Sequence, residues 1–140
     1  MPLIETTGIF IGTTIAGWII KKLCDGALRQ IKGLHFGTKE KRALETAVSI
    51  SLEKVKNQNP VIYEKLFKEK LFWSAFQEEF NSLLDPNQQP DIEGLTNKVE
   101  EVSPVSKNEL LKGLDSLFQI ISEEIAKQKD LIALEQFRLS

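Results

Sequence analysis

Cys24 and His35 are the first candidates for chemistry in this chain, and each residue type occurs once. A cysteine beside a histidine can form a nucleophile, and a zinc site needs several such residues at close spacing. No such set surrounds either residue in the sequence, although residues far apart in a chain can meet in a fold. We therefore expect Cys24 to pack as a small apolar residue and His35, in GLHFG, to lie at a turn.

Two further patterns resemble sites without completing one. The segment Gly12–Gly17 has the glycine spacing of a phosphate-binding loop, but Trp18 and Ile19 stand where lysine and serine or threonine are required. Paired glutamates occur at 78–79, 100–101 and 123–124. Adjacent carboxylates on a helix point in different directions and usually form a solvated face. We expect no enzyme, cofactor, metal or small-molecule substrate.

The charge of the chain argues against nucleic acid as a partner. The formal net charge is −2 and the pI is about 5.5, whereas nucleic-acid binders carry a dense basic face. Six basic residues could still form a surface for anionic lipid or a protein: Lys39, Lys41, Arg42, Lys65, Lys68 and Lys70. Ordinary helix surface, balanced by nearby glutamates, is the favoured interpretation of these residues.

Length and periodicity predict a single all-α domain over residues 1–140, folded as a four- or five-helix bundle. The expected helices span about 5–33 with a bend near 25–26, 38 to the KNQNP segment at 56–60 with Thr38 as cap, 60–84, 92–102, and 106 onward. Ser106 and Glu109 form the S-x-x-E pattern that opens the last helix, whose periodicity continues to Ser140. A missing stop signal there suggests the N-terminal part of a longer protein. The single cysteine favours a reducing, cytoplasmic setting.

The leading segment, GIFIGTTIAGWIIKK, is the most unusual part of the sequence. Residues 6–20 contain no charge and would span about 22 Å as a helix, somewhat short for a transmembrane helix. Five isoleucines and one phenylalanine contribute only about −3 kcal/mol on the membrane-insertion scale. Insertion into a membrane is therefore marginal, and a small change in free energy can switch it on or off.

Small residues in the same segment repeat at helical spacing. Gly8, Gly12 and Ala16 recur every four positions, beside Gly17, and would form a smooth stripe on a helix. Such stripes allow close helix packing both in lipid and in a soluble core. The residues alone leave two interpretations open: a buried core helix and a membrane-active helix.

In this arrangement the chain resembles the HeLo-like cell-death domains and their bacterial counterparts, the Bell domains. The resemblance lies in the leading MPLIETTGIFIGTTIAGWIIKK, in the helical domain that follows, and in LLKGLDSLFQIISEEIAKQKDLIALEQFRLS, which is similar to segments leading into a nucleotide-binding module. It implies the effector domain of a cyanobacterial NLR-like NACHT or STAND receptor, cytoplasmic at rest. Receptor oligomerisation would gather several copies, release their first helices and permeabilise the cell membrane.

Carried over to this chain, the resemblance implies an inserting segment between Leu3 and Ile20. Its members are Leu3, Ile4, Gly8, Ile9, Phe10, Ile11, Gly12, Ile15, Ala16, Gly17, Trp18, Ile19 and Ile20. Lys21 and Lys22, which follow directly, would contact lipid headgroups. The implied partners are membrane lipid and further copies of the protein. The alternative is an adaptor domain whose helical surface recruits a separate effector.

Overall fold

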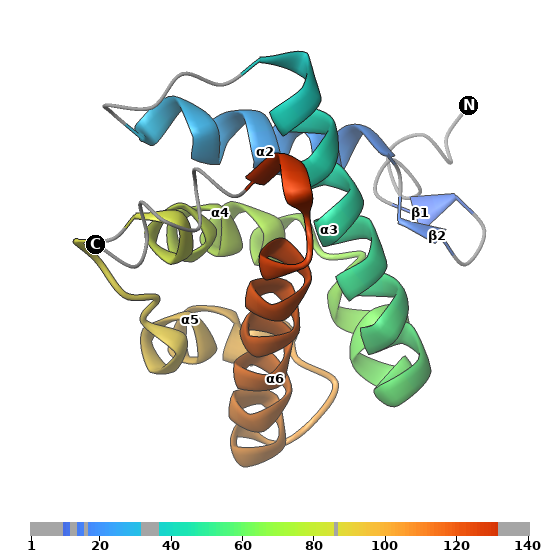
Figure 1. Cartoon of the computed structure of the whole chain (residues 1–140). Coiled ribbons are helices and arrows are strands. Elements are labelled where there is room, and N and C mark those ends of the chain that lie inside the picture. The colour runs from blue at the N-terminus through green and yellow to red at the C-terminus, as the bar shows by residue number, and fades with distance from the viewer. Residues whose placement is uncertain (1–9, 12–13, 16, 32–36, 86, 132–140) are drawn as a thin grey trace.

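The computed structural model describes residues 10–11, 14–15, 17–31, 37–85 and 87–131. Within them the chain forms an all-helical bundle, as predicted, made of α2 (Gly17–Gln30), α3 (Thr38–Gln58), α4 (Lys70–Leu84), α5 (Ile92–Val99) and α6 (Lys107–Ala126). α3 packs along α6, and α2 packs against both α3 and α4 (Figure 1). α5 joins α4 to α6 on the side of α4 away from α2.

The expected long leading helix is wrong at residues 10–11 and 14–15, which form strands. β1 (Phe10–Ile11) and β2 (Thr14–Ile15) pair antiparallel, with Phe10 opposite Ile15 and Ile11 opposite Thr14. The helix begins at Gly17, passes unbroken through the expected bend and ends at Gln30. β-branched and aromatic residues favour extended pairing, and here this tendency wins over the helical spacing. The predicted stripe of Gly8, Gly12 and Ala16 lies on residues outside the described ones, so it stays a prediction.

The expected helix over 60–84 is divided into two pieces. A π-helical turn spans Ile62–Leu66, and α4 begins only at Lys70, after Glu69 has taken an extended conformation. The indole N–H of Trp73 donates a hydrogen bond to the carbonyl oxygen of Phe67, which lies at the break. Dividing the helix lets Phe67 stack on Phe72 with ring centroids 5.2 Å apart. A straight helix would place these two residues on different faces.

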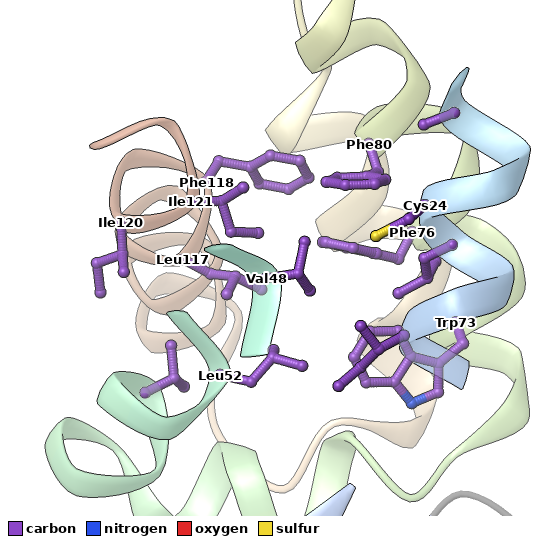
Figure 2. Close-up of a cluster of buried hydrophobic side chains, with 14 of the residues drawn as sticks. Cys24, Val48, Leu52, Trp73, Phe76, Phe80, Leu117, Phe118, Ile120 and Ile121 are labelled. Carbon is purple, nitrogen blue, oxygen red and sulfur yellow. The ribbon is translucent and has the colours of Figure 1, made fainter. Parts of the chain in front are cut away.

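An aromatic core fills the centre of the bundle. Phe76 stacks on Phe72 and Phe80 and lies 5.1 Å from Phe118 of α6, measured between ring centroids. Figure 2 shows side chains of α2, α3, α4 and α6 meeting there, with Val48 of α3 close by. Offset and edge-to-face ring pairs contribute beyond the burial of their area. This cluster is the most densely aromatic part of the described structure.

Hydrogen-bonded caps mark the starts of α3 and α6. Ser106 accepts a hydrogen bond from the Glu109 N–H, as predicted, whereas α3 is capped by Gly37 and not by Thr38. The Glu40 carboxylate accepts from the Gly37 N–H at 2.8 Å. α6 ends at Ala126, earlier than its periodicity predicts, because the chain turns through Lys129–Leu131 to bury Leu131. The remainder of that prediction, 132–140, lies outside the described residues.

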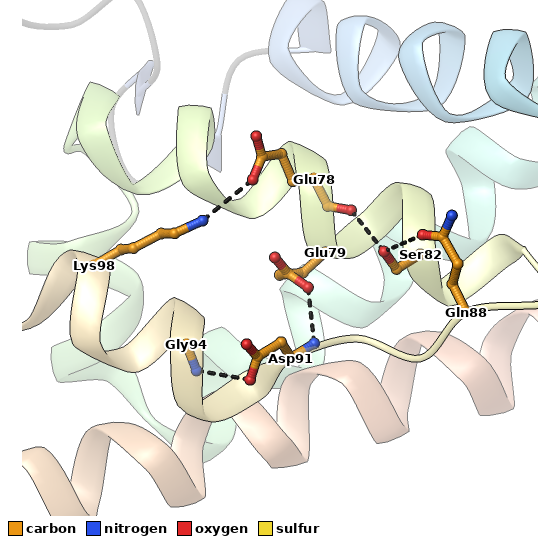
Figure 3. Close-up of polar contacts among 7 residues, drawn as sticks. All are labelled: Glu78, Glu79, Ser82, Gln88, Asp91, Gly94 and Lys98. Atoms are coloured by element: carbon orange, nitrogen blue, oxygen red, sulfur yellow. Dashed lines mark hydrogen bonds and ion pairs between the residues drawn. The ribbon is translucent and has the colours of Figure 1, made fainter.

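The connection from α4 to α5 is held by polar contacts (Figure 3). The buried Glu79 carboxylate accepts a hydrogen bond from the Asp91 N–H at 2.7 Å, and Asp91 in turn accepts from the Gly94 N–H at the start of α5. Glu78, the neighbour of Glu79, points outward and pairs with Lys98 at 3.2 Å. The two adjacent carboxylates therefore have separate structural uses.

Candidate functional site

The described part of the leading segment is attached to the bundle through Ile15. The Ile15 side chain is 4% exposed, and its N–H donates to the Tyr63 hydroxyl at 3.1 Å. Tyr63 is itself buried, next to the aromatic core, and burial raises the pKa of its hydroxyl. The hydroxyl is therefore protonated at neutral pH, and its oxygen serves as the acceptor at the base of the hairpin.

The first turns of α2 divide the remaining predicted site residues between two environments. Ile19 and Ile20 are buried in the core, whereas Trp18 is 50% exposed and Lys21 and Lys22 are exposed. This is the expected consequence of helical periodicity, since Ile19, Ile20 and Leu23 share one face. The predicted inserting segment thus contains residues that already belong to the core and one large aromatic side chain that does not.

Trp18 lies between two grooves. The first, of about 660 Å³, is shallow and lies along α2 toward α3; four cations line it, together with Asp25. They are Lys21, Lys22, Arg29 and Lys41. The second, of about 450 Å³, lies between α2 and α4 and is lined by Lys70 and Trp73 among others. Neither groove was evident from the sequence, because its cations come from separate helices.

Asp25 is the single carboxylate among the residues that line the first groove. It lies 3.6 Å from the Lys41 ammonium, an ion-pair distance that is too long for a direct hydrogen bond. Lys41 belongs to α3, so this pair connects the two helices that border the groove. The remaining cations outnumber the carboxylate and leave the groove electropositive.

Close packing with α4 fixes the position of α2. The Gln77 amide donates to the Leu23 carbonyl oxygen at 3.1 Å and to Asn81 at 2.8 Å. A Cβ atom at Gly26 would lie only 2.8 Å from the Gln77 amide nitrogen, so the absence of a side chain there permits this contact. Cys24 is fully buried in the same interface, as predicted, and burial, with Glu45 and Asp25 adding to it, raises the pKa of its thiol.

The part of the chain that the structure describes contains no assembled group of catalytic residues. No set of three histidine, cysteine or acidic residues there is placed to hold a metal ion. Glu124 is buried and bonds Lys54 and Lys127 at 2.6 and 2.9 Å, which makes it a structural ion-pair centre between α3 and α6. His35 lies outside the described residues, so its predicted turn is not tested.

Several predicted membrane-insertion residues also lie outside the described structure: Leu3, Ile4, Gly8, Ile9, Gly12 and Ala16. Of the others, Phe10 and Ile11 form β1, Ile15 ends β2, and Gly17 begins α2. Across the described ranges, no helix has the length and apolar character needed to cross a membrane.

Comparisons of the chain with protein-family models, with curated proteins and with solved structures gave no match. The resemblance to HeLo-like and Bell domains therefore stays a prediction, and the function has to be argued from the residues and their geometry.

Proposed function

We propose that this domain is a membrane-targeting, pore-forming cell-death effector of an NLR-like receptor, and that oligomerisation releases its leading segment. The observation that supports the proposal is that β1 and β2 precede the bundle in the chain and pair with each other. Phe10 and Ile11 lie opposite Ile15 and Thr14, and the Ile15 side chain packs in the core. A segment at the start of the chain can leave the bundle while α2–α6 stay folded, provided that the contacts of Ile15 are broken.

The described contacts of the hairpin allow an estimate of the cost of release. Burying an isoleucine stabilises by about 1.5–3 kcal/mol, and a hydrogen bond such as that from Ile15 to Tyr63 contributes about 0.5–1.5 kcal/mol. A coupling free energy between sites is typically about 1–3 kcal/mol, and high effective concentration adds to it. Release would therefore have to overcome at least about 2–4.5 kcal/mol, the sum of these two contributions, which is of the order that the clustering of several copies supplies.

Gly17 marks the boundary between the part that is released and the part that stays. It begins α2, is exposed, and has no heavy atom within 4 Å of the position a Cβ would take. Residues 3–16 would leave, while Ile19 and Ile20 remain in the core and keep α2 in place. Lys21 and Lys22 would then lie close to the base of the inserted segment.

Dye release from lipid vesicles tests the proposal. The whole chain would be fused at its C-terminus to a trimeric coiled coil and compared with the unfused chain. Two variants of the fusion would be measured beside it: Gly12→Glu, which places a charge in the apolar segment, and a truncation of residues 1–14, which keeps Ile15 and α2. We expect the fused chain to release dye. Both variants should release it at no more than about one tenth of that rate, because the charge in Gly12→Glu costs several kcal/mol in the bilayer and the truncation lacks most of the segment.

Asn108→Glu, on the exposed surface of α6, is the matched control, because it adds the same charge away from both the leading segment and α5. It should leak like the unchanged fusion. Equal leakage from the unchanged fusion, Gly12→Glu and the truncation would refute the proposal. Absence of leakage from a correctly trimeric fusion would refute it as well, and would favour an adaptor that recruits a separate effector.

A further inference from the structure

The two halves of the chain carry opposite charge. Residues 1–70 contain twelve lysines and arginines against seven aspartates and glutamates, whereas residues 71–140 contain six against thirteen. The net charge of −2 hides this division. Some of this charge is paired within the molecule, as between Lys39 and Asp130 and between Lys54 and Glu124. Where charge of one sign is gathered on one surface and charge of the other sign on another, it steers two such surfaces together.

The basic half presents the groove between Trp18 and Lys41. Its cations come from α2 and α3, which border this shallow groove. A half-exposed tryptophan at its edge adds apolar area of the kind that anchors protein interfaces. A helix edge that carries carboxylates complements the charge of such a groove.

The acidic half presents such an edge in α5 and the 3₁₀ turn Glu100–Val102 that follows it. Leu95, Thr96 and Val99 face inward and are buried. The exposed carboxylates of this short segment are Asp91, Glu93, Glu100 and Glu101. Lys98, the single lysine of the segment, is paired with Glu78 of α4, so the outward charge is strongly negative.

The two surfaces lie on opposite sides of α4, which packs against α2 with one side and against α5 with another (Figure 1). They therefore cannot neutralise each other within one molecule. Contacts between unlike surfaces of identical chains are heterologous and can be repeated from copy to copy.

We propose that the α2–α3 groove receives the acidic α5 segment of a second copy, so that clustered domains associate head to tail. Exposed ion pairs are individually weak and are screened by salt. The contact is therefore absent from dilute chains and forms when copies are held at high effective concentration. It would place each copy in the same orientation relative to the next along the assembly.

Sedimentation of the whole chain without lipid tests this contact, and mixing of charge-reversed variants makes the test specific. At low ionic strength we expect concentration-dependent association with a Kd of about 0.1–1 mM. Lys21→Glu with Lys22→Glu should weaken it by about tenfold or more, and so should Glu100→Lys with Glu101→Lys. An equimolar mixture of the two variants should associate again, because each supplies the surface that the other lacks.

Lys107→Glu with Lys112→Glu is the control matched to the Lys21 and Lys22 variant, since it makes the same change of net charge on the exposed side of α6. It should associate like the unchanged chain. Failure of the mixture to associate, or a chain that stays monomeric up to about 1 mM at low salt, would overturn the proposal. If the lysine variant instead loses sedimentation with vesicles of anionic lipid while self-association is unchanged, the groove serves lipid headgroups. Because no leakage is measured, these outcomes are independent of the proposed pore-forming function.

Discussion

Ile15, at the end of the β1–β2 hairpin, and Phe76, in the aromatic core, are both apolar and buried, yet different neighbours hold them. Phe76 is completely buried and contacts rings from α4 and α6, whereas the described attachment of the hairpin passes through Ile15 and the Tyr63 hydroxyl. Apolar composition alone therefore does not measure how firmly a segment is held. The number of independent elements that enclose a side chain is the better measure.

Phe76→Ala gives the largest expected effect, because it empties the centre of the core. Truncation of a buried phenylalanine typically costs about 3–5 kcal/mol. We expect the free energy of unfolding in urea to fall by that amount, enough to unfold a domain of ordinary stability. Phe76→Leu, which keeps most of the volume, should retain more than half of the stability. Equal stability of Phe76→Ala and the unchanged chain would contradict the central place given to this ring.

Glu124→Gln tests whether sensitivity to acid belongs to the bundle and not to the hairpin. Hydrogen bonds from Lys127 and Lys54 lower the pKa of this carboxyl. A carboxyl with a lowered pKa in the folded protein stabilises it at neutral pH, and the contribution is lost as the pH falls through the folded pKa.

We therefore expect Glu124→Gln to cost about 1–2 kcal/mol at pH 7, and the difference from the unchanged chain to shrink toward zero as the pH falls below about 4. Urea unfolding at several pH values measures it. Glu123→Gln, the exposed neighbour, serves as control and should leave stability unchanged at each pH. A cost that stays constant down to low pH would show that the ionised form is not responsible.

Tyr63→Phe loosens the hairpin without disturbing the core. It removes the acceptor for the Ile15 N–H and keeps the ring, so we expect the local opening free energy at Ile15 to fall by about 1 kcal/mol. Hydrogen exchange of the Ile15 amide should become about fivefold faster. The global melting temperature should change little. If the proposed function holds, the trimeric fusion should release dye from vesicles at a lower protein-to-lipid ratio. A large loss of global stability with unchanged exchange at Ile15 would mean that the Tyr63 hydroxyl stabilises the core and not the hairpin.

Gly26→Ala gives the smallest expected effect and tests how α2 is held. Alanine favours the helix by about 1 kcal/mol, but its Cβ would approach the Gln77 amide too closely. Since the end of a glutamine side chain can move, we expect a net change below about 0.5 kcal/mol in thermal or urea unfolding. In a Gln77→Ala background the same substitution should become stabilising. Strong destabilisation in both backgrounds would mean that the backbone, and not Gln77, limits the space.

Local patterns of the sequence determined the helical bundle and much of its core. The stripe of Leu110, Leu114, Phe118, Ile121 and Ile125 is buried as its spacing predicts, and Ser106 caps that helix. Cys24 is an apolar core residue. These features depend on neighbours within about one or two helical turns, which a linear sequence records directly.

Contacts between distant residues decided the parts that periodicity missed. The run IFIGTTI at 9–15, rich in β-branched and aromatic residues around a glycine, contains a hairpin signal that the helical spacing concealed. The break before α4 follows from the aromatic packing of Phe67, Phe72 and Trp73. The groove beside Trp18 collects Lys21 and Lys41 from two helices. Each of these outcomes is chosen by burial and pairing across the fold, because a residue that suits two local structures adopts the one that its tertiary partners stabilise.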